Sequence, residues 1–308
     1  MPPAEIEKSS SRVYLIIGDS EFFMSLTLFM YHRILPEDRP EALSVAVFER
    51  QLEYLGRHYR VLRAAEVEKY ITGELKIPGD CAALSFDDGW ADNLFYADNV
   101  LEKHGFSALM AVSAGYLHDG PVRESETGAV LSRRMDEAQA AARNGDKSSY
   151  LSIAELEKMQ SSGRWQLEVH GTRHELGAGG ASVLSCPQDG RSAAEFRDFL
   201  VSDLENAKDK LSRITGRTHR MMFWPWGHYS TLAVGTAASL GLDIQFTVAK
   251  GAIRNGDTRP ILPRIGASPR WKKFARNAFV FRHGALEFLH GFSHSLKVNF
   301  DDRVEGMR

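Results

Sequence analysis

The segment Cys81-Ala82-Ala83-Leu84-Ser85-Phe86-Asp87-Asp88-Gly89 is an apolar run that ends in two adjacent carboxylates and a glycine. A buried strand has no structural use for two successive carboxylates, whereas α/β enzymes place their chemistry at the carboxyl ends of parallel strands. Gly89 allows the chain to turn sharply directly after them. A solvated Asp-Asp-Gly turn explains these residues equally well, because aspartate and glycine are common in turns. The functional interpretation therefore depends on partners elsewhere in the chain.

The composition is that of a globular protein with a sizeable core. The chain has 308 residues, 43% hydrophobic and 25% charged, which fits one large or two small domains. Its formal net charge of -2 gives no electrostatic reason to expect a nucleic acid partner. Cys81 and Cys186 lie far apart without CxxC spacing, so buried thiols are expected rather than a disulfide or a cysteine zinc site.

The first residues lead to an expectation about location. Residues 1–21 form a polar N-terminal segment that lacks the basic and then apolar pattern of a secretory signal. The most apolar window, residues 22–31, is about half the ~20 residues of a transmembrane helix and predicts a buried strand. A cytoplasmic location is expected if the sequence begins at its natural methionine.

Apolar β-type runs alternate with helical patterns along most of the chain. This alternation predicts a parallel α/β domain, and seven or eight such units predict a TIM-like (β/α) barrel over residues 22–269. The predicted strands are 26–31, 60–62, 82–86, 107–112, 166–169, 220–223, 244–248 and 261–265.

Helix signals lie between these strands. Two segments show the SxxE spacing of a capping box and then a glycine where the helix should end, namely Ser152, Glu155 and Gly163, and Ser192, Glu195 and Gly216. Further helices are predicted over 47–59, 64–72, 93–103 and 231–240.

Two segments do not fit the repeat. The insert 115–150 is long and polar, and its alanine-rich run predicts a helix of its own. Long inserts on barrels are often lids or substrate walls, although a decorative surface helix is equally consistent. Residues 270–308 form a basic amphipathic C-terminal extension, which we expect to be a terminal helix packed on the barrel. Contact with a membrane surface or a partner is the alternative.

A second strand end carries residues that bind metals. The sequence His170-Gly171-Thr172-Arg173-His174 follows the predicted strand 166–169, as the two aspartates follow theirs. Imidazole nitrogen and carboxylate oxygen suit a divalent ion such as zinc, and three protein ligands leave a position for water. Taken alone, HxxxH is a weak signal, since surface or helical neighbours often have this spacing.

A third element is the aromatic stretch from Phe223 to Tyr229. Its Trp224, Pro225 and Trp226 predict a rigid shelf on which sugar rings stack, with a backbone N–H beside the proline as an oxyanion donor. An aromatic core cluster followed by a turn is the alternative interpretation.

In this order, and each after a β-type run, the three elements resemble the polysaccharide deacetylase family, also called NodB-homology domains, over about residues 26–265. Residues 85–89 are similar to the family's (T/S)FDDG motif. Tyr31-His32-Arg33-Ile34 and the aromatic shelf are similar to members of the exopolysaccharide-modifying branch. The resemblance implies a distorted (β/α) barrel that holds a divalent metal, usually zinc, and removes N-acetyl groups from N-acetylglucosamine polymers or related amides.

The resemblance also implies a role for each motif residue. Asp87 takes the place of the general base, and Asp88, His170 and His174 take the places of the metal ligands for Zn²⁺ or another divalent ion. The implied reaction is hydrolysis of an N-acetyl amide on an amino sugar or polysaccharide, in which the ion activates water and Asp87 accepts its proton. The oxyanion would face the ion and the backbone N–H of Trp226.

Two positions depart from the family pattern. Phe223 stands where many members have an arginine that pairs with the base aspartate, and Arg264, at a predicted strand end, is the candidate replacement. The histidine of a Leu-x-His motif, which protonates the leaving amine, has no convincing counterpart. His32 and His228 are candidates for that acid, and return of the proton by Asp87 is a third route.

These departures leave two alternatives open. One is a catalytically silent member that binds a glycan or a protein partner through the barrel face. The other is a metal amidohydrolase acting on a small cyclic amide, because related barrels use the same ligands. The leading expectation is an enzyme whose partner is an N-acetylated sugar or polysaccharide, with no nucleic acid involved and the oligomeric state undefined.

Overall fold

Strands and helices alternate along the chain in the computed structural model, which describes residues 25–125 and 132–282. The expectations for segment 1–21 and for the C-terminal extension beyond residue 282 lie outside the described residues. The described α-helices are α1 (Val45–His58), α2 (Ala64–Ile71), α3 (Asp98–His104), α5 (Met135–Arg143), α6 (Ile153–Ser161), α7 (Ala193–Thr215), α8 (Thr231–Ser239) and α9 (Trp271–Arg282).

The predicted helices are confirmed with small differences at their ends. Ser152 and Ser192 begin α6 and α7 with capping boxes, and Gly216, at φ 67°, ends α7. The helix predicted over 93–103 starts as a π-helical turn, Asn93–Ala97, before α3. The helix of the insert is α5.

A parallel sheet forms the centre of the fold. Its parallel strands, in spatial order, are β1 (Ser25–Tyr31), β5 (Cys81–Asp88), β6 (Ala108–Val112), β7 (Trp165–Val169), β8 (Met221–Phe223) and β9 (Ile244–Phe246). The short β4 (Arg60–Val61) pairs in parallel with β5, and β10 (Ile253–Arg254) pairs antiparallel with β1. A separate pair, β2 (Arg33–Leu35) and β3 (Ala42–Ser44), was not predicted from the sequence.

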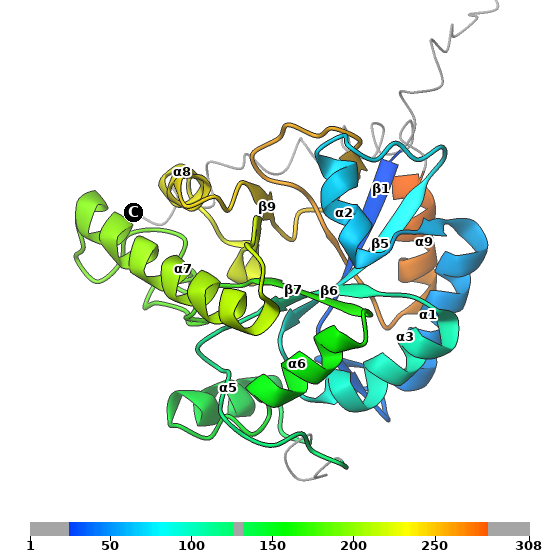
Figure 1. The fold of residues 1–308 in the computed structure, drawn as a ribbon, viewed down its shortest axis with the longest axis horizontal. Coiled ribbons are helices and arrows are strands. Elements are labelled where there is room, and N and C mark those ends of the chain that lie inside the picture. The colour runs from blue at the N-terminus through cyan, green and yellow to red at the C-terminus, as the bar shows by residue number, and fades with distance from the viewer. Residues whose placement is uncertain (1–24, 126–131, 283–308) are drawn as a thin grey trace, which may run out of the picture.

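The segment around Leu262 links the two edges of this sheet. Leu262 bridges in parallel to Phe246 of β9, and β11 (Ile265–Gly266) pairs in parallel with β1. Pro263 lies between the two pairings and has no N–H, which explains why the strand predicted over 261–265 is divided. The sheet curls on itself with helices on its outer side, so the predicted (β/α) barrel class is confirmed (Figure 1).

Side chains on the two faces of the sheet enter two hydrophobic clusters. The outer cluster packs Phe29, Ala82 and Met110 against helices that include α1, α3, α6 and α7. The inner cluster contains Leu28 and Ala83, and α2 packs against it. This alternation, with period two along each strand, decides which strand-end residues face the interior of the barrel.

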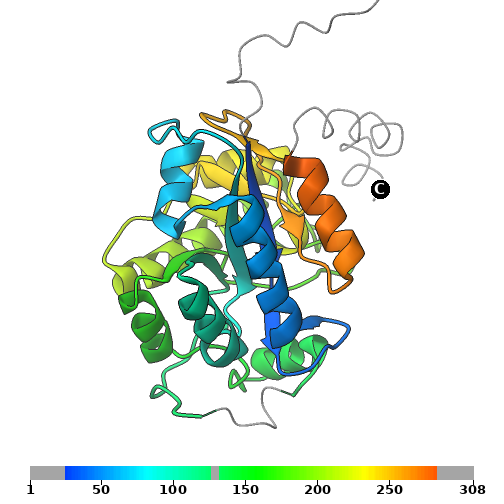
Figure 2. The same ribbon diagram turned by 90° about the vertical axis from the view of Figure 1, so that its right-hand side faces the viewer.

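The helix α9 covers β1 on the flank that it shares with α1 (Figure 2). It buries Phe274, Ala278 and Phe281, and the hydroxyl of Ser25 donates to the carbonyl of Phe281 at 3.4 Å. The C-terminal extension therefore begins with a helix packed on the barrel, as predicted. Among the described helices, none has the length and apolar character needed to cross a membrane.

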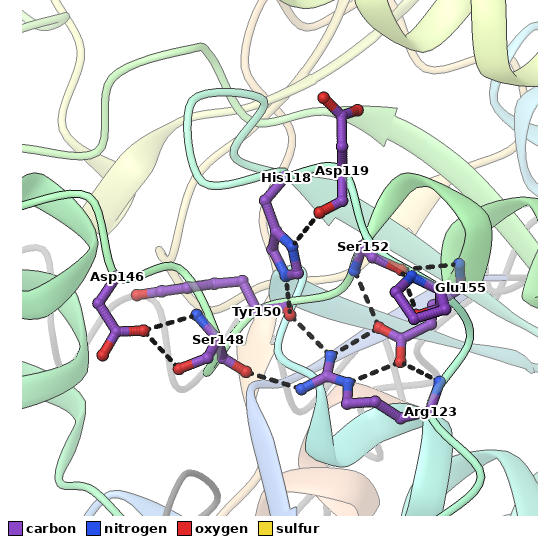
Figure 3. A network of polar contacts seen from close by, with 9 residues as sticks. His118, Asp119, Arg123, Asp146, Ser148, Tyr150, Ser152 and Glu155 are labelled. Atoms are coloured by element: carbon purple, nitrogen blue, oxygen red, sulfur yellow. Dashed lines mark hydrogen bonds and ion pairs between the residues drawn. The ribbon is translucent and has the colours of Figure 1, made fainter.

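A polar cluster, the Arg123–Glu155 clamp, holds the insert against α6 (Figure 3). The fully buried Glu155 accepts bonds from Nε and Nη2 of Arg123, each at 2.6 Å, and from the N–H of Ser152 at 2.9 Å. The same guanidinium donates to the carbonyl oxygens of Ser148 and Tyr150 at 2.7 and 2.8 Å. The Glu155 carboxylate thus caps α6 and, through Arg123, holds the first and last parts of the insert together.

We expect Glu155→Ala to destabilise the fold by about 3 kcal/mol, because it removes the cap and leaves the Arg123 guanidinium without its carboxylate. Glu157→Ala, at an exposed position of the same helix, should change the free energy of unfolding by less than about 0.5 kcal/mol. Urea unfolding of both variants measures the difference. Equal effects would show that the clamp contributes nothing beyond helix propensity.

Candidate metal and catalytic site

The ends of β5 and β7 meet at one edge of the sheet. Asp88 pairs with Val112 of β6, and Val112 pairs with Val169 of β7. The N–H of His170 then donates to the carbonyl of Val112 at 3.1 Å. The aspartates and the first histidine of the two sequence motifs therefore lie on either side of a single strand.

Asp88 leaves the extended conformation at the end of β5. Successive side chains of a strand point to opposite faces, so a regular strand would direct Asp87 and Asp88 apart. Asp88 has φ 79°, and the next residue, Gly89, has φ 83°. Positive φ in a non-glycine residue costs roughly 1–2 kcal/mol. This backbone strain lets both carboxylates serve one site.

The loop that carries His170 and His174 is held by close backbone contacts. Gly171, at φ 79°, turns the chain, and its carbonyl accepts the N–H of Ala114 at 2.9 Å. A side chain at Gly115 would lie 2.3 Å from the carbonyl oxygen of Thr172, so only glycine permits this approach. The two histidines are thus presented from a rigid turn.

Asp203 of α7 also holds this loop. Its carboxylate accepts the N–H groups of Thr172 and Arg173 at 2.7 and 3.1 Å, and its carbonyl accepts the Thr172 hydroxyl at 2.7 Å. Burial raises the pKa of Asp203 to about 6, although these bonds favour its ionised form. Sequence reasoning missed Asp203, because no local motif marks a residue about 30 positions beyond the loop it supports.

Asp88, His170 and His174 form a buried cluster with the donor atoms of a metal site. Their candidate ligand atoms lie within 4.8 Å of one another. Oδ1 of Asp88 is 3.3 Å from Nε2 of His170 and 3.1 Å from Nε2 of His174. The structure therefore brings the three predicted ligands together.

The hydrogen bonding around these atoms fits a cation. Nδ1 of His170 lies 2.6 Å from the carbonyl oxygen of Phe223, so Nδ1 carries a hydrogen, and in the neutral form of the ring the Nε2 lone pair points at Asp88. Oδ1 of Asp88 is buried without a hydrogen bond. Two lone pairs that face each other in a buried site repel unless a positive charge lies between them, so these side chains suit a divalent ion.

The pKa shifts show the same preference for positive charge. Burial disfavours ionised Asp88, but His174 and His170 outweigh burial and keep the pKa of Asp88 below its usual range. Burial also opposes protonation of His170, yet the proximity of Asp88 and the charge of Asp87 raise its pKa. Burial lowers the pKa of His174 to about 4, which leaves this ring neutral and able to act as a ligand.

Asp87 is paired with Arg264 inside the barrel. Nη1 and Nη2 of Arg264 donate to Oδ1 and Oδ2 of Asp87 at 2.6 and 2.9 Å, and both side chains are almost fully buried. The guanidinium also lies 4.7 Å from the ring centroid of Phe223. Burial opposes ionisation of Asp87, but Arg264 and His170 hold its pKa below the usual range. Asp87 is thus paired with an arginine from a segment other than β8, and the ring of Phe223 packs against the guanidinium of that arginine.

The aromatic shelf is only partly available to a ligand. Trp224 is fully buried, and its indole N–H donates to Oε1 of Gln245 at 2.9 Å. The expectation that Trp224 stacks on a sugar is therefore wrong, because its ring belongs to the core; Pro225 is buried as well. Trp226 differs, since it adopts φ 55° and its ring centroid lies 3.9 Å from that of His174.

The two candidate acids have different surroundings. The charge of His32 lowers the pKa of Asp87, of Asp88 and of His174, which places this half-buried ring beside the site. His228 instead faces the loop after β7, where its Nδ1 accepts the N–H of Ser182 at 3.2 Å. Of the two, His32 is the better placed to reach a bound substrate.

Sequence reasoning also missed an aromatic group behind Asp88. The indole N–H of Trp90 donates to Oδ2 of Asp88 at 2.9 Å, and Tyr150 stacks on Trp90. The hydroxyl of Tyr116 donates to the carbonyl of His174 at 2.7 Å. Trp90 directly follows the aspartate motif, and this position in the sequence was the signal that could have identified it. Tyr116 and Tyr150 both belong to the insert.

A cavity of about 510 Å³ lies on the outer side of the histidine loop, between α6 and α7. Its lining includes Thr172 but none of Asp87, Asp88, His170 or His174. We therefore place the chemistry at the strand ends and not in this cavity.

Comparison with known proteins agrees with this geometry. The sequence profile described as polysaccharide deacetylase matches residues 75–244, more than half of the chain. No curated protein sequence matches. Solved structures with the same fold include IcaB from Ammonifex degensii, with 24% identity and a TM-score of 0.66 over 83% of this chain and 96% of that one.

Two further structures share the fold at lower identity. A de-N-acetylase from Aggregatibacter actinomycetemcomitans has 18% identity and a TM-score of 0.66 over 82% of this chain and 98% of that one. The BpsB deacetylase domain from Bordetella bronchiseptica has 19% identity and a TM-score of 0.60 over 80% and 97%.

A curled (β/α) barrel with carboxylates and histidines at its strand ends defines the chain as a barrel hydrolase. The matching profile is more specific: the chain belongs to the polysaccharide deacetylase family, whose members are hydrolases of C–N bonds other than peptide bonds. The family resemblance stated from the sequence is confirmed.

The pKa of Asp203 leads to a prediction about stability. A carboxyl with a pKa raised from 3.8 to about 6 on folding stabilises the fold fully below pH ~4 and loses that contribution as pH rises through 6. Relative to Asp203→Asn, wild type should therefore lose roughly 3 kcal/mol of unfolding free energy between pH 4 and 7. Urea unfolding in EDTA measures this difference.

Asp198→Asn, at an exposed position of the same helix, is the matched control. Its difference from wild type should stay constant over the same pH range. A constant difference for Asp203→Asn as well would contradict the raised pKa.

Proposed function

We propose that this protein hydrolyses the N-acetyl amide of an amino sugar in a polysaccharide, with a divalent ion, Zn²⁺ as first choice, held by Asp88, His170 and His174. The observation that carries this proposal is the buried pair of Asp87 and Arg264 directly beside the candidate ion site. A purely structural metal site has no use for a second, ionised carboxylate that it does not bind. A hydrolase needs one as a proton acceptor.

In the proposed mechanism, Asp88, His170 and His174 would hold a divalent ion, which would supply Lewis-acid activation of water and of the acetyl carbonyl. The residues of the chain keep the proton acceptor ionised and set the charge of the site. Arg264 holds Asp87 ionised through two hydrogen bonds, and each carboxylate oxygen keeps a free lone pair for the proton of the attacking water. Asp87, Asp88 and Arg264 sum to one negative charge when the histidines are neutral, so the site attracts a dication.

Protonation of the leaving amine is the step for which we assign His32. It lies at the end of β1, and its charge acts on both aspartates. Trp226, whose ring lies against that of His174 with an interplanar angle of 35°, is the remaining shelf residue that can contact a sugar ring. Trp224 and Pro225 position it from the core.

The comparisons support the choice of substrate. The family description names a polysaccharide, and the structural neighbours include a de-N-acetylase and a deacetylase domain. The sequence similarity of residues 31–34 to the exopolysaccharide-modifying branch supports an extracellular polysaccharide or its precursor as the substrate class.

The test combines metal content with acetate release from N-acetylchitooligosaccharides. Wild type should bind one zinc equivalent and release acetate faster as the oligomer lengthens. Asp87→Asn should keep the zinc and lose about 10²–10⁴-fold in kcat, because only the proton acceptor is removed. His170→Ala should lose the zinc itself, and chelation of wild type should abolish activity reversibly.

Other outcomes distinguish the alternatives. Zinc bound without turnover of any acetylated sugar would indicate a catalytically silent member. Turnover of small cyclic amides, with no dependence on oligomer length, would indicate an amidohydrolase.

The acid assignment has a separate test. His32→Gln should lower kcat by about 10²-fold, because the proton donor is lost. His228→Gln should leave kcat unchanged, since its ring faces the loop after β7. The opposite pattern would transfer the role to His228, and no effect in either variant would favour return of the proton by Asp87.

A further inference from the structure

The two carboxylate oxygens of Asp88 have different environments. Oδ1 faces Nε2 of His170 and of His174 and accepts no hydrogen bond. Oδ2 accepts the indole N–H of Trp90 at 2.9 Å. Oδ1 lies next to both histidines, whereas Oδ2 is directed at the Trp90 N–H, so Oδ1 is the oxygen that Asp88 presents to an ion.

Trp90 itself is held on both faces. It is fully buried, and Tyr150 stacks on it with ring centroids 4.5 Å apart and an interplanar angle of 27°. The guanidinium carbon of Arg33 lies 4.7 Å from the Trp90 ring centroid, which is the geometry of a cation–π contact. The indole therefore has little freedom to rotate its N–H away from Asp88.

Arg33 is anchored from two other parts of the chain. It is almost fully buried, and its Nε donates to Oδ2 of Asp92 at 2.7 Å. Oδ1 of Asp92 accepts the N–H of Ile34 at 3.0 Å, and Nη1 of Arg33 donates to the carbonyl of Arg133 in the insert at 2.5 Å. A buried ion pair with these additional bonds is rigid, because any movement would leave a charge unpaired.

The insert fixes the other side of the indole. Trp90 and Tyr150 form an antiparallel backbone bridge, and the Tyr150 carbonyl accepts a bond from Arg123 of the Arg123–Glu155 clamp. Ala138 and Ala142 of α5 pack in the same cluster as Trp90 and Tyr150. The insert is therefore neither a detached lid nor a decoration; it completes the cage around Trp90.

We propose that Trp90 is a positioning residue that fixes Asp88 as a ligand through Oδ1 alone, and that the insert, by holding Trp90, sets the affinity of the site for its ion. This inference rests on the ion site of the proposed function. A ligand that is already oriented loses less conformational freedom when it binds, and partners of metal ligands typically contribute 10–100-fold to metal affinity.

The experiment compares Trp90→Phe with Trp165→Phe. Trp165 is also buried and also donates its indole N–H to an aspartate, to Oδ1 of Asp98 at 2.7 Å, but it does not contact the cluster of Asp88, His170 and His174. Each change removes a ring N–H bonded to a carboxylate. Zn²⁺ dissociation constants are measured on the metal-free full chain by chelator competition, and thermal unfolding is measured in EDTA.

We expect Trp90→Phe to weaken Zn²⁺ binding 10–100-fold and to change the visible spectrum of bound Co²⁺. Trp165→Phe should stay within about twofold of wild type in affinity, whatever its effect on unfolding. If Trp90→Phe does not fold, Tyr150→Leu replaces it, because that change removes the stacked ring and keeps the indole, and it should weaken Zn²⁺ binding in the same direction.

Wild-type affinity in Trp90→Phe, or equal weakening in Trp165→Phe, would overturn the positioning role and leave the proposed function intact. Absence of Zn²⁺ binding by wild type would instead overturn the ion site of the proposed function, and this inference with it. The two failures are thus distinguishable.

Discussion

A β-strand sends successive side chains to opposite faces, and the site of this protein needs Asp87 and Asp88 on the same face. The positive φ of Asp88 resolves this conflict at the last residue of β5. Strain of this kind persists only where surrounding contacts over-determine the conformation. Here the contacts are Trp90 on one oxygen of Asp88 and the two histidines facing the other.

Burial of charge imposes the next constraint. Two adjacent carboxylates at an almost dry barrel end would repel each other and lose solvation, so each needs its own compensation. Asp87 receives it from the Arg264 guanidinium, and Asp88 from the histidines and the cation that their arrangement suits. The proposed roles, proton acceptor for Asp87 and metal ligand for Asp88, follow from this difference in partners, because the two residues have the same chemistry.

Much of this was predictable from the sequence, and the exceptions have physical reasons. The barrel class and the capping boxes followed from local patterns, and the aspartates and histidines were expected to meet because strand ends in a parallel sheet share an edge. The choice of Asp88 as the ligand came from the family resemblance. Trp224 was misjudged because sequence does not tell a buried aromatic from an exposed one in a short apolar stretch. The supports from Asp203 and Tyr150 were not seen because they depend on tertiary contacts across long sequence separations.

The replacement of the family's arginine shows why site geometry is a firmer guide than sequence position. A side chain from β8 can reach the point in the barrel interior beside Asp87. A side chain from the segment around Leu262, which lies between β9 and β1 in space, can reach the same point. In this chain the guanidinium comes from Arg264. Phe223 occupies the position where many family members have the arginine, and its ring packs against the Arg264 guanidinium. A substitution that placed arginine at position 223 would bring two cations to one carboxylate in a buried space, so the two solutions exclude each other. Buried Asp87, the proposed base, therefore pairs with one arginine, and the closed topology of the barrel allows that arginine to come from more than one strand.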